Sequence, residues 1–158
     1  MTRTFAIAAS IAIAAAGLSA CGDNAAEAPA EEQALAFTVD NARLVLPAVE
    51  GNPAAVYFDL TLGGEKNYTI RRADVEGAER AEVHEFSEWD GEMVMGESAP
   101  MNMTPGETVN FEPGARHVMA FNLSPELQAG GTTEVTITVL GGDKFSFPAQ
   151  IQAAGEDR

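Results

Sequence analysis

The chain has 158 residues and a formal net charge of −15, with 24 acidic residues against nine basic ones and only two histidines. Such acidity argues against binding to nucleic acid and against charge-driven binding to an anionic lipid surface. The single cysteine, Cys21, excludes an intrachain disulfide. Metal binding in the folded domain would therefore depend on histidine, methionine and carboxylate side chains.

The first 20 residues are predicted to be a bacterial lipoprotein signal peptide. Arg3 supplies a positive start, an alanine-rich apolar run follows, and the order Leu-Ser-Ala-Cys ends at Cys21. The apolar run is short for a permanent membrane span. The order of residues resembles a lipobox, which predicts cleavage before Cys21 and lipidation of that residue. An ordinary secretory signal with an incidental cysteine is the alternative.

The rest of the chain is expected to hold one domain on a tether. Residues 21–34 consist of the lipidated cysteine and an acidic stretch rich in alanine, glutamate and proline, which has too few large apolar groups to fold. Residues 35–153 suit a single domain with one core, and residues 154–158 form a short polar tail. We therefore expect a periplasmic domain that a lipid anchors to the inner or the outer membrane.

The domain is predicted to be all-β. Val135, Ile137 and Val139 alternate with polar residues, which is the two-residue period of a half-buried strand. Turn signals rich in glycine and proline separate many short apolar segments, a pattern typical of a Greek-key sandwich or barrel. No long helix is expected, and residues 124–128 form at most one turn. The expected strands cover residues 42–46, 55–62, 68–75, 81–86, 92–95, 108–111, 117–123, 133–140 and 145–151.

Two histidines and two methionines form the candidate metal site. His117 and Met119 lie two apart on an expected strand, so they share one face. A turn after His84 is expected to bring Met95 back beside it, so that two strand pairs facing one another supply four ligands. Imidazole and thioether make an uncharged set suited to Cu(I), whereas thioether is a poor zinc ligand and a blue-copper site needs a cysteine thiolate.

Each of these residues has a plainer explanation when it is taken alone. A histidine on a strand is usually hydrogen bonded or exposed, and a methionine usually fills core space. The combination of four residues, with both histidines included, favours the metal site. Met93, Met101 and Met103 are expected to pack or to lie in an exposed loop. Trp89 is expected to shield the metal, to contact a partner or to cap the edge of the sandwich.

The spacing His-x10-Met-x21-His-x-Met resembles that of the PCuAC family of periplasmic copper chaperones. His84, Met95, His117 and Met119 match it residue for residue, and the likeness extends over about residues 38–151. The resemblance implies a cupredoxin-like β-sandwich with a shallow Cu(I) site at the surface. It also implies delivery of copper to the binuclear copper centre of cytochrome c oxidase, often alongside a thioredoxin-like copper protein.

Two departures from the family pattern leave this Cu(I) site intact. Residues 96–100 lack the basic residue and the Pro-Val that often follow the first methionine, and residues 153–158 lack the tail rich in histidine and methionine that some members use for Cu(II). We expect a monomer and no enzymatic activity, because no catalytic motif is present in the sequence. A copper buffer without a dedicated acceptor and a metal-free β-sandwich interaction module are the alternatives.

Overall fold

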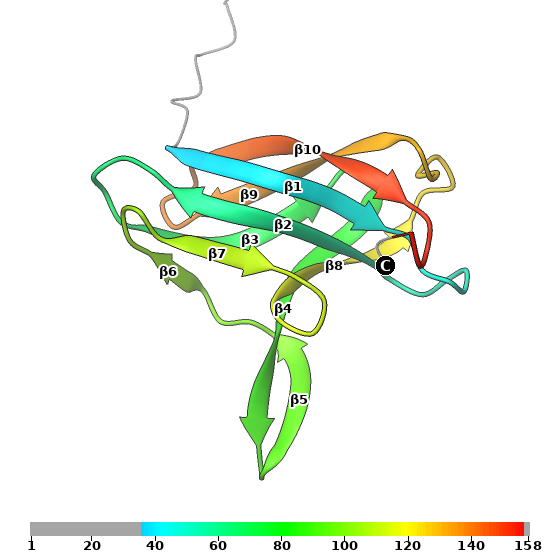
Figure 1. Cartoon of the computed structure of the whole chain (residues 1–158), viewed down its shortest axis with the longest axis horizontal. Coiled ribbons are helices and arrows are strands. Elements are labelled where there is room, and N and C mark those ends of the chain that lie inside the picture. Colours follow the sequence, from blue (N-terminus) through cyan, green and yellow to red (C-terminus); the bar gives the residue numbers. More distant parts are fainter. Residues whose placement is uncertain (1–35, 157–158) are drawn as a thin grey trace, which may run out of the picture. The chain divides into compact units, whose positions relative to one another are not determined.

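The computed structural model describes residues 36–156 of the chain (Figure 1). The predicted signal peptide, the lipidation site Cys21 and the predicted tether lie outside the described residues. The described residues form ten strands and no helix, so the expected all-β class is confirmed. A helix long and apolar enough to cross a membrane is accordingly not found in this part of the chain.

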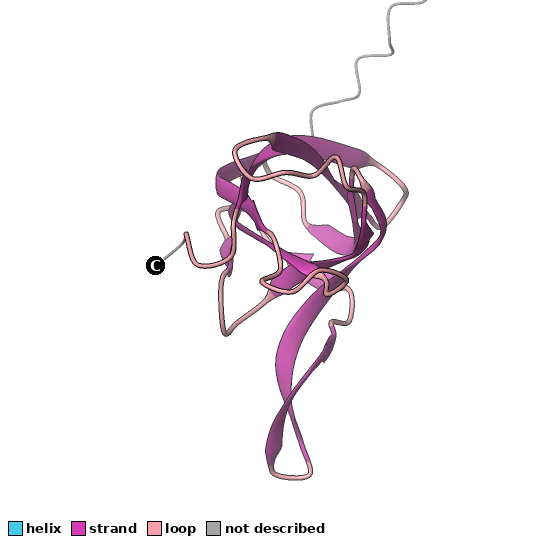
Figure 2. Cartoon of the chain, turned by 90° about the vertical axis from the view of Figure 1, so that its right-hand side faces the viewer, coloured by secondary structure: helices cyan, strands magenta, loops and turns pink. Residues whose placement is uncertain are grey.

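The strands form one continuous sheet with the order β5-β4-β8-β2-β1-β10-β9-β3-β6, and β7 pairs with β2 beyond the end of β8. Figure 2 shows that this sheet curls round, so that its strands surround a common interior. The strands are β1 (Phe37–Val45), β2 (Ala54–Leu62), β3 (Tyr68–Val75), β4 (Ala78–Trp89), β5 (Glu92–Glu97), β6 (Met101–Met103), β7 (Thr108–Phe111), β8 (His117–Leu123), β9 (Thr132–Val139) and β10 (Lys144–Gln152).

The core follows from strict alternation along the central strands. In β2 every second residue is buried, and the residues between them are half-buried. Phe58 of β2 stacks on Phe111 of β7, with the ring centroids 4.1 Å apart. Val135, Ile137 and Val139 are fully buried, as the period of two predicted. One outer face of the sheet therefore stays available for side chains that do not contribute to the core.

β1 and β6 are two of the strands that differ from the prediction. β1 begins at Phe37, five residues earlier than expected. The prediction missed this start because Asn41 has a positive φ of 56° and a bulge between Asp40 and Arg43 interrupts the alternation typical of a strand. β6 was not expected, since three residues are too few to show a period. It pairs with β3 and buries Met103 completely.

The longest strand, β4, carries His84 of the candidate site and lies between the two strands that carry the other three residues. It extends over 12 residues, whereas only residues 81–86 were expected as a strand. Its first part pairs with β8 and its second part with β5. Asp90 and Gly91 both have positive φ, which suits the two-residue turn of a tight hairpin. Figure 1 shows the β4–β5 hairpin extending away from the other strands.

Candidate metal site

Both histidines of the chain lie side by side on one face of the sheet. His84 of β4 is directly opposite His117 of β8, and their ring centroids are 6.2 Å apart. An ion held about 2.0 Å from one nitrogen of each imidazole would place the centroids about 5–6 Å apart. The observed spacing of 6.2 Å is slightly larger, so a small movement of the rings would let one ion bind between them. Val118, between His117 and Met119, points to the other face and is fully buried.

The two predicted methionines lie on the same face as the histidines. Met119 follows His117 by two residues and is half-buried, and its register partner on β4 is Glu82. Met95 of β5 is opposite Phe86, which places it one diagonal step from His84. With 41% of its surface exposed, Met95 is the most accessible of the four residues, and His117, with 4%, is among the buried ones.

The structure corrects one part of the predicted arrangement. Two strand pairs facing one another were expected to supply the four residues. Instead the residues come from β5, β4 and β8, which are three neighbouring strands of the same sheet. The candidate site is therefore an open surface patch built on paired strands, and no space between two layers is involved. Whether these four side chains bind a metal stays a prediction.

Each histidine ring already has a hydrogen-bond partner. The Nδ1–H of His117 donates to the carbonyl oxygen of Ala115 at 2.9 Å, and this bond leaves Nε2 with a free lone pair. Nε2 of His84 lies 3.1 Å from Oε2 of Glu82. The ring of Tyr57 lies 6.1 Å from that of His117 and covers its side toward β2. The rings are thus oriented by the protein without a metal.

Glu82 is a site residue that the sequence prediction missed. Its Oε1 accepts a hydrogen bond of 2.6 Å from Nη1 of Arg80, whose guanidinium lies 4.2 Å from the ring centroid of Phe121. A signal was present in the sequence, because Glu82 precedes His84 by two residues and so shares its face of the strand. Its carboxylate is a hard ligand and so falls outside the soft set of imidazole and thioether.

The opposite face of β4 is fixed by a polar network. The hydroxyl of Ser98 donates to Glu85 at 2.8 Å, and Arg116 forms an ion pair with the same carboxylate. The bond from Ser98 lowers the pKa of Glu85 below its usual value, and Arg116 lowers it further against the opposing effect of partial burial. Arg116 also contacts the sulfur of Met101 at 3.0 Å. These contacts join the segments that flank the site to β4.

The remaining methionines and the tryptophan separate into two groups. Met103 is fully buried and Met101 packs against the core, so the packing expected of them is confirmed. Met93 is 65% exposed and Trp89 is 77% exposed on the β4–β5 hairpin. Trp89 therefore does not cap the edge of the sandwich. By strand alternation it leaves the hairpin on the face opposite to Met95.

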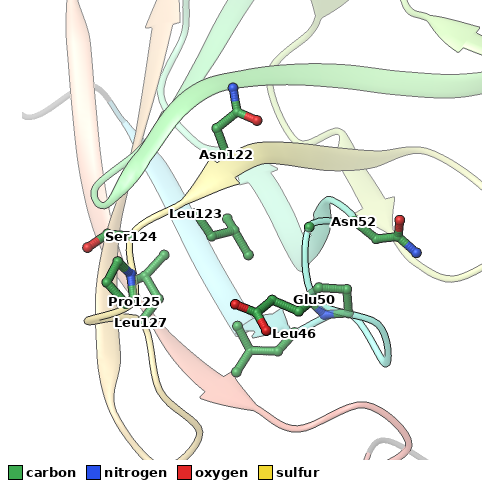
Figure 3. A pocket seen from close by; sticks show the side chains of 10 residues that line it. Leu46, Glu50, Asn52, Asn122, Leu123, Ser124, Pro125 and Leu127 are labelled. Carbon is green, nitrogen blue, oxygen red and sulfur yellow. The ribbon is translucent and has the colours of Figure 1, made fainter.

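A surface pocket of about 530 Å³ lies at the far end of β8 from His117 (Figure 3). Its wall combines the apolar side chains of Leu46, Leu123 and Leu127 with the carboxylate of Glu50. None of the four predicted ligands contributes to it. Within residues 36–156, no three histidine, cysteine or acidic side chains converge as a preformed metal site, so a metal here would need the methionines or a movement of side chains.

Comparison with solved structures shows the same fold in PCuAC domains. A copper-bound PCuAC domain from PmoF2 is 14% identical with a TM-score of 0.60, over 75% of this chain and 93% of that one. An apo PCuAC domain from PmoF1 is 20% identical with the same TM-score, over 75% and 94% of the two chains. The solution structure of CuI-DR1885 from Deinococcus radiodurans is 19% identical with a TM-score of 0.58, over 85% and 89%.

The predicted resemblance to PCuAC proteins is thus confirmed, and at these identities the likeness shows the fold. No curated protein matches the chain. A family model described as "Putative lipoprotein LpqE-like" matches residues 37–151, which is most of the chain and nearly all of its described part. The chain therefore belongs to the LpqE-like family.

Proposed function

We propose that the domain binds Cu(I) through His84, Met95, His117 and Met119 and acts as a periplasmic copper chaperone. One observation carries this proposal: both histidines are register partners on one sheet face, with a thioether on either side. Two imidazoles and two thioethers make a neutral, soft set that suits Cu(I). The shared fold with a copper-bound PCuAC domain and with CuI-DR1885 supports the same conclusion.

The exposure of the ligands suits a protein that gives its metal away. Handing copper to an acceptor requires one ligand to be exchanged before the others leave. Met95 is 41% exposed, while His117 is almost buried and held by Ala115. In our proposal an acceptor displaces Met95 first, and the histidines keep the ion in place until the acceptor's own ligands have engaged. This role requires no catalytic step.

The proposed acceptor is the binuclear copper centre of cytochrome c oxidase, reached directly or through a thioredoxin-like copper protein. Lipidation at Cys21 would hold the domain at a bacterial membrane, and the acidic residues 22–34 would give it reach. The donor would act as a monomer. A copper buffer would use the same four residues but would need no dedicated acceptor.

The binding proposal is tested by titrating the purified domain with Cu(I) against a competing chelator. We expect one ion per domain. His84→Ala and His117→Ala should each weaken Cu(I) binding by more than about ten-fold, because loss of a residue that only supports a metal ligand already costs about ten-fold or more. Met93→Ala is the matched control, because this exposed methionine lies on the same hairpin face. Wild-type protein that fails to compete for Cu(I) would favour the metal-free interaction module.

Delivery needs a separate experiment. Deletion of the gene is expected to lower cytochrome c oxidase activity in cells grown at low copper, and copper supplementation is expected to restore it. A strain that carries His117→Ala should behave like the deletion strain. Normal oxidase activity in the deletion strain, combined with tight Cu(I) binding by the purified domain, would favour the copper buffer.

A further inference from the structure

We infer that Glu82 is a ligand for Cu(II), so that the same surface patch takes either oxidation state of copper with a different set of side chains. The Cu(II) set comprises the carboxylate of Glu82 with the imidazoles of His84 and His117. Met95, on the other flank of His84, serves Cu(I) only. The inference rests on the proposed copper site, but it concerns a residue outside the four soft ligands.

The first support is the position of Glu82 in the sheet. It lies directly opposite Met119, and the next pair on the same face is His84 opposite His117. Side chains in such neighbouring cross-strand pairs are within reach of one another. Glu82 therefore occupies the fourth corner of a square whose other corners are three proposed ligands. Met95, by contrast, belongs to β5 and reaches the patch along a diagonal.

The second support is a distance. Oε2 of Glu82 is 3.1 Å from Nε2 of His84. Imidazole and carboxylate bind a divalent first-row metal such as zinc at about 2.0–2.1 Å, so two such ligand atoms set about 90–100° apart are about 2.8–3.2 Å from each other. The observed distance lies within this interval. This pair can hold one ion when the proton on Nε2 of His84 moves to Nδ1, which keeps the ring neutral.

The third support is the way in which the carboxylate is held. Arg80 binds Oε1 at 2.6 Å and is itself stacked on Phe121, so Oε2 is the oxygen that faces His84. The side chain of Glu82 is only 21% exposed. A carboxylate restrained in this way needs little reorganisation to bind a cation. His117 lies across the patch, and a rotation of its ring is the movement that completes the set.

Hard and soft preferences then separate Glu82 from Met95, although Glu97, an exposed carboxylate directly opposite His84 on β5, adds a second hard side chain on the flank of Met95. Cu(II) favours nitrogen and oxygen ligands, whereas a thioether is suited to Cu(I). A carboxylate also offsets part of the charge of the divalent ion, which the four neutral ligands of the Cu(I) set cannot do. The alternative role of Glu82 is to orient the ring of His84 from outside the metal shell. An orienting residue would strengthen binding of both oxidation states alike, so the two roles have different consequences.

The test measures both affinities in Glu82→Gln, which keeps the size of the side chain. Cu(I) is titrated anaerobically against a chelator, and Cu(II) is titrated in air with glycine as competitor and followed by electron paramagnetic resonance. We expect the variant to bind Cu(II) at least about ten-fold more weakly and to change its resonance spectrum, while its Cu(I) affinity stays within about three-fold of wild type. Glu134→Gln, an exposed glutamate on β9 that is not next to β4 or β8, is the matched control.

The outcomes separate this inference from the copper proposal itself. A smaller effect on Cu(II), or an equal loss for both oxidation states, would overturn the ligand role of Glu82 even if wild-type protein binds Cu(I) tightly. Absence of Cu(I) binding by wild-type protein would instead contradict the proposed function. Circular dichroism of the metal-free variant shows whether it folds, and Glu82→Asp, which keeps the charge but shortens the reach, gives a second estimate of the Cu(II) loss.

Discussion

His84 lies directly opposite His117 in the antiparallel pairing of β4 with β8. Because side chains alternate between the two faces of a strand, a register slip of one residue would send one of these imidazoles toward the core. The candidate site is therefore defined by strand register, and the turns and networks that fix β4 also fix the distance between the two rings.

The first prediction separates binding from folding at Met95. Met95→Ala should weaken Cu(I) binding by more than about ten-fold. Because the side chain is 41% exposed on the hairpin, the free energy of unfolding of the metal-free protein should fall by less than about 1 kcal/mol. Competition titration and chemical denaturation check the two parts. A large loss of stability in the metal-free variant would identify Met95 as a core residue.

Met103→Ala supplies the opposite control for this experiment. Met103 is fully buried in the core, away from the face that carries the histidines. Its truncation should lower the free energy of unfolding by about 2–5 kcal/mol. The folded fraction of this variant should still bind Cu(I) with the affinity of wild type. If Met103→Ala lost Cu(I) affinity while it remained folded, the ligand set would need revision.

The second prediction concerns the turn that leads into β4. Gly77 has a φ of +80°, and a Cβ added there would lie 3.0 Å from Cγ of Leu127. Gly91, at the tip of the hairpin, has nearly the same φ of +81° with nothing within 4 Å. Gly77→Ala should therefore destabilise the domain more than Gly91→Ala, whose cost is only the strained backbone, of about 1 kcal/mol. Denaturation of both variants measures the difference.

The third prediction is a pH dependence at Glu107. Its carboxylate accepts hydrogen bonds from the backbone N–H of Thr104 at 2.8 Å and from the Thr104 hydroxyl at 3.0 Å. These bonds, the backbone one first, lower the pKa of Glu107. A lowered pKa in the folded state stabilises the domain above the unfolded value of about 4.3, and this contribution is lost as the pH falls through the folded value.

Glu107→Gln should therefore flatten the acid limb of the stability curve. Between about pH 6 and about pH 3 the denaturation midpoint of wild type should fall more than that of the variant. Glu126→Gln, at an exposed turn, controls for the loss of one negative charge. Equal slopes for wild type and Glu107→Gln would show that the hydrogen bonds to Thr104 do not contribute to stability.

The sequence predicted those features that a single strand carries by itself. His117 and Met119 share a face because they are two residues apart, and Val118 is buried for the same reason. Which strands become neighbours is not encoded in the period of any one strand. For this reason the pairing of β4 with β8 was not foreseen, and the four candidate ligands were expected from facing strand pairs instead of three adjacent strands.

Other parts were missed because their signals are local exceptions. β6 has three residues and therefore no visible period, and the start of β1 was hidden by the bulge near Asn41. Glu82 carried a readable signal, its spacing from His84, but a glutamate on an exposed strand is usually a solvated residue. Its register position opposite Met119 and its hydrogen bond to His84 identify it as part of the candidate site.

The last prediction concerns Trp89 as a contact residue for the acceptor. Trp89 is 77% exposed near the tip of the hairpin and leaves it on the face opposite to Met95. Trp89→Ser should therefore leave the Cu(I) affinity unchanged, and it should change the free energy of unfolding by less than about 1 kcal/mol.

Transfer of copper from the Trp89→Ser variant to an acceptor protein should become slower, because a large exposed aromatic side chain is a typical anchor at an interface. Stopped-flow measurements of the transfer rate test this prediction. Leu140→Ser is the control, because Leu140 is 64% exposed on another part of the surface. Unchanged transfer would leave Trp89 without a role in delivery.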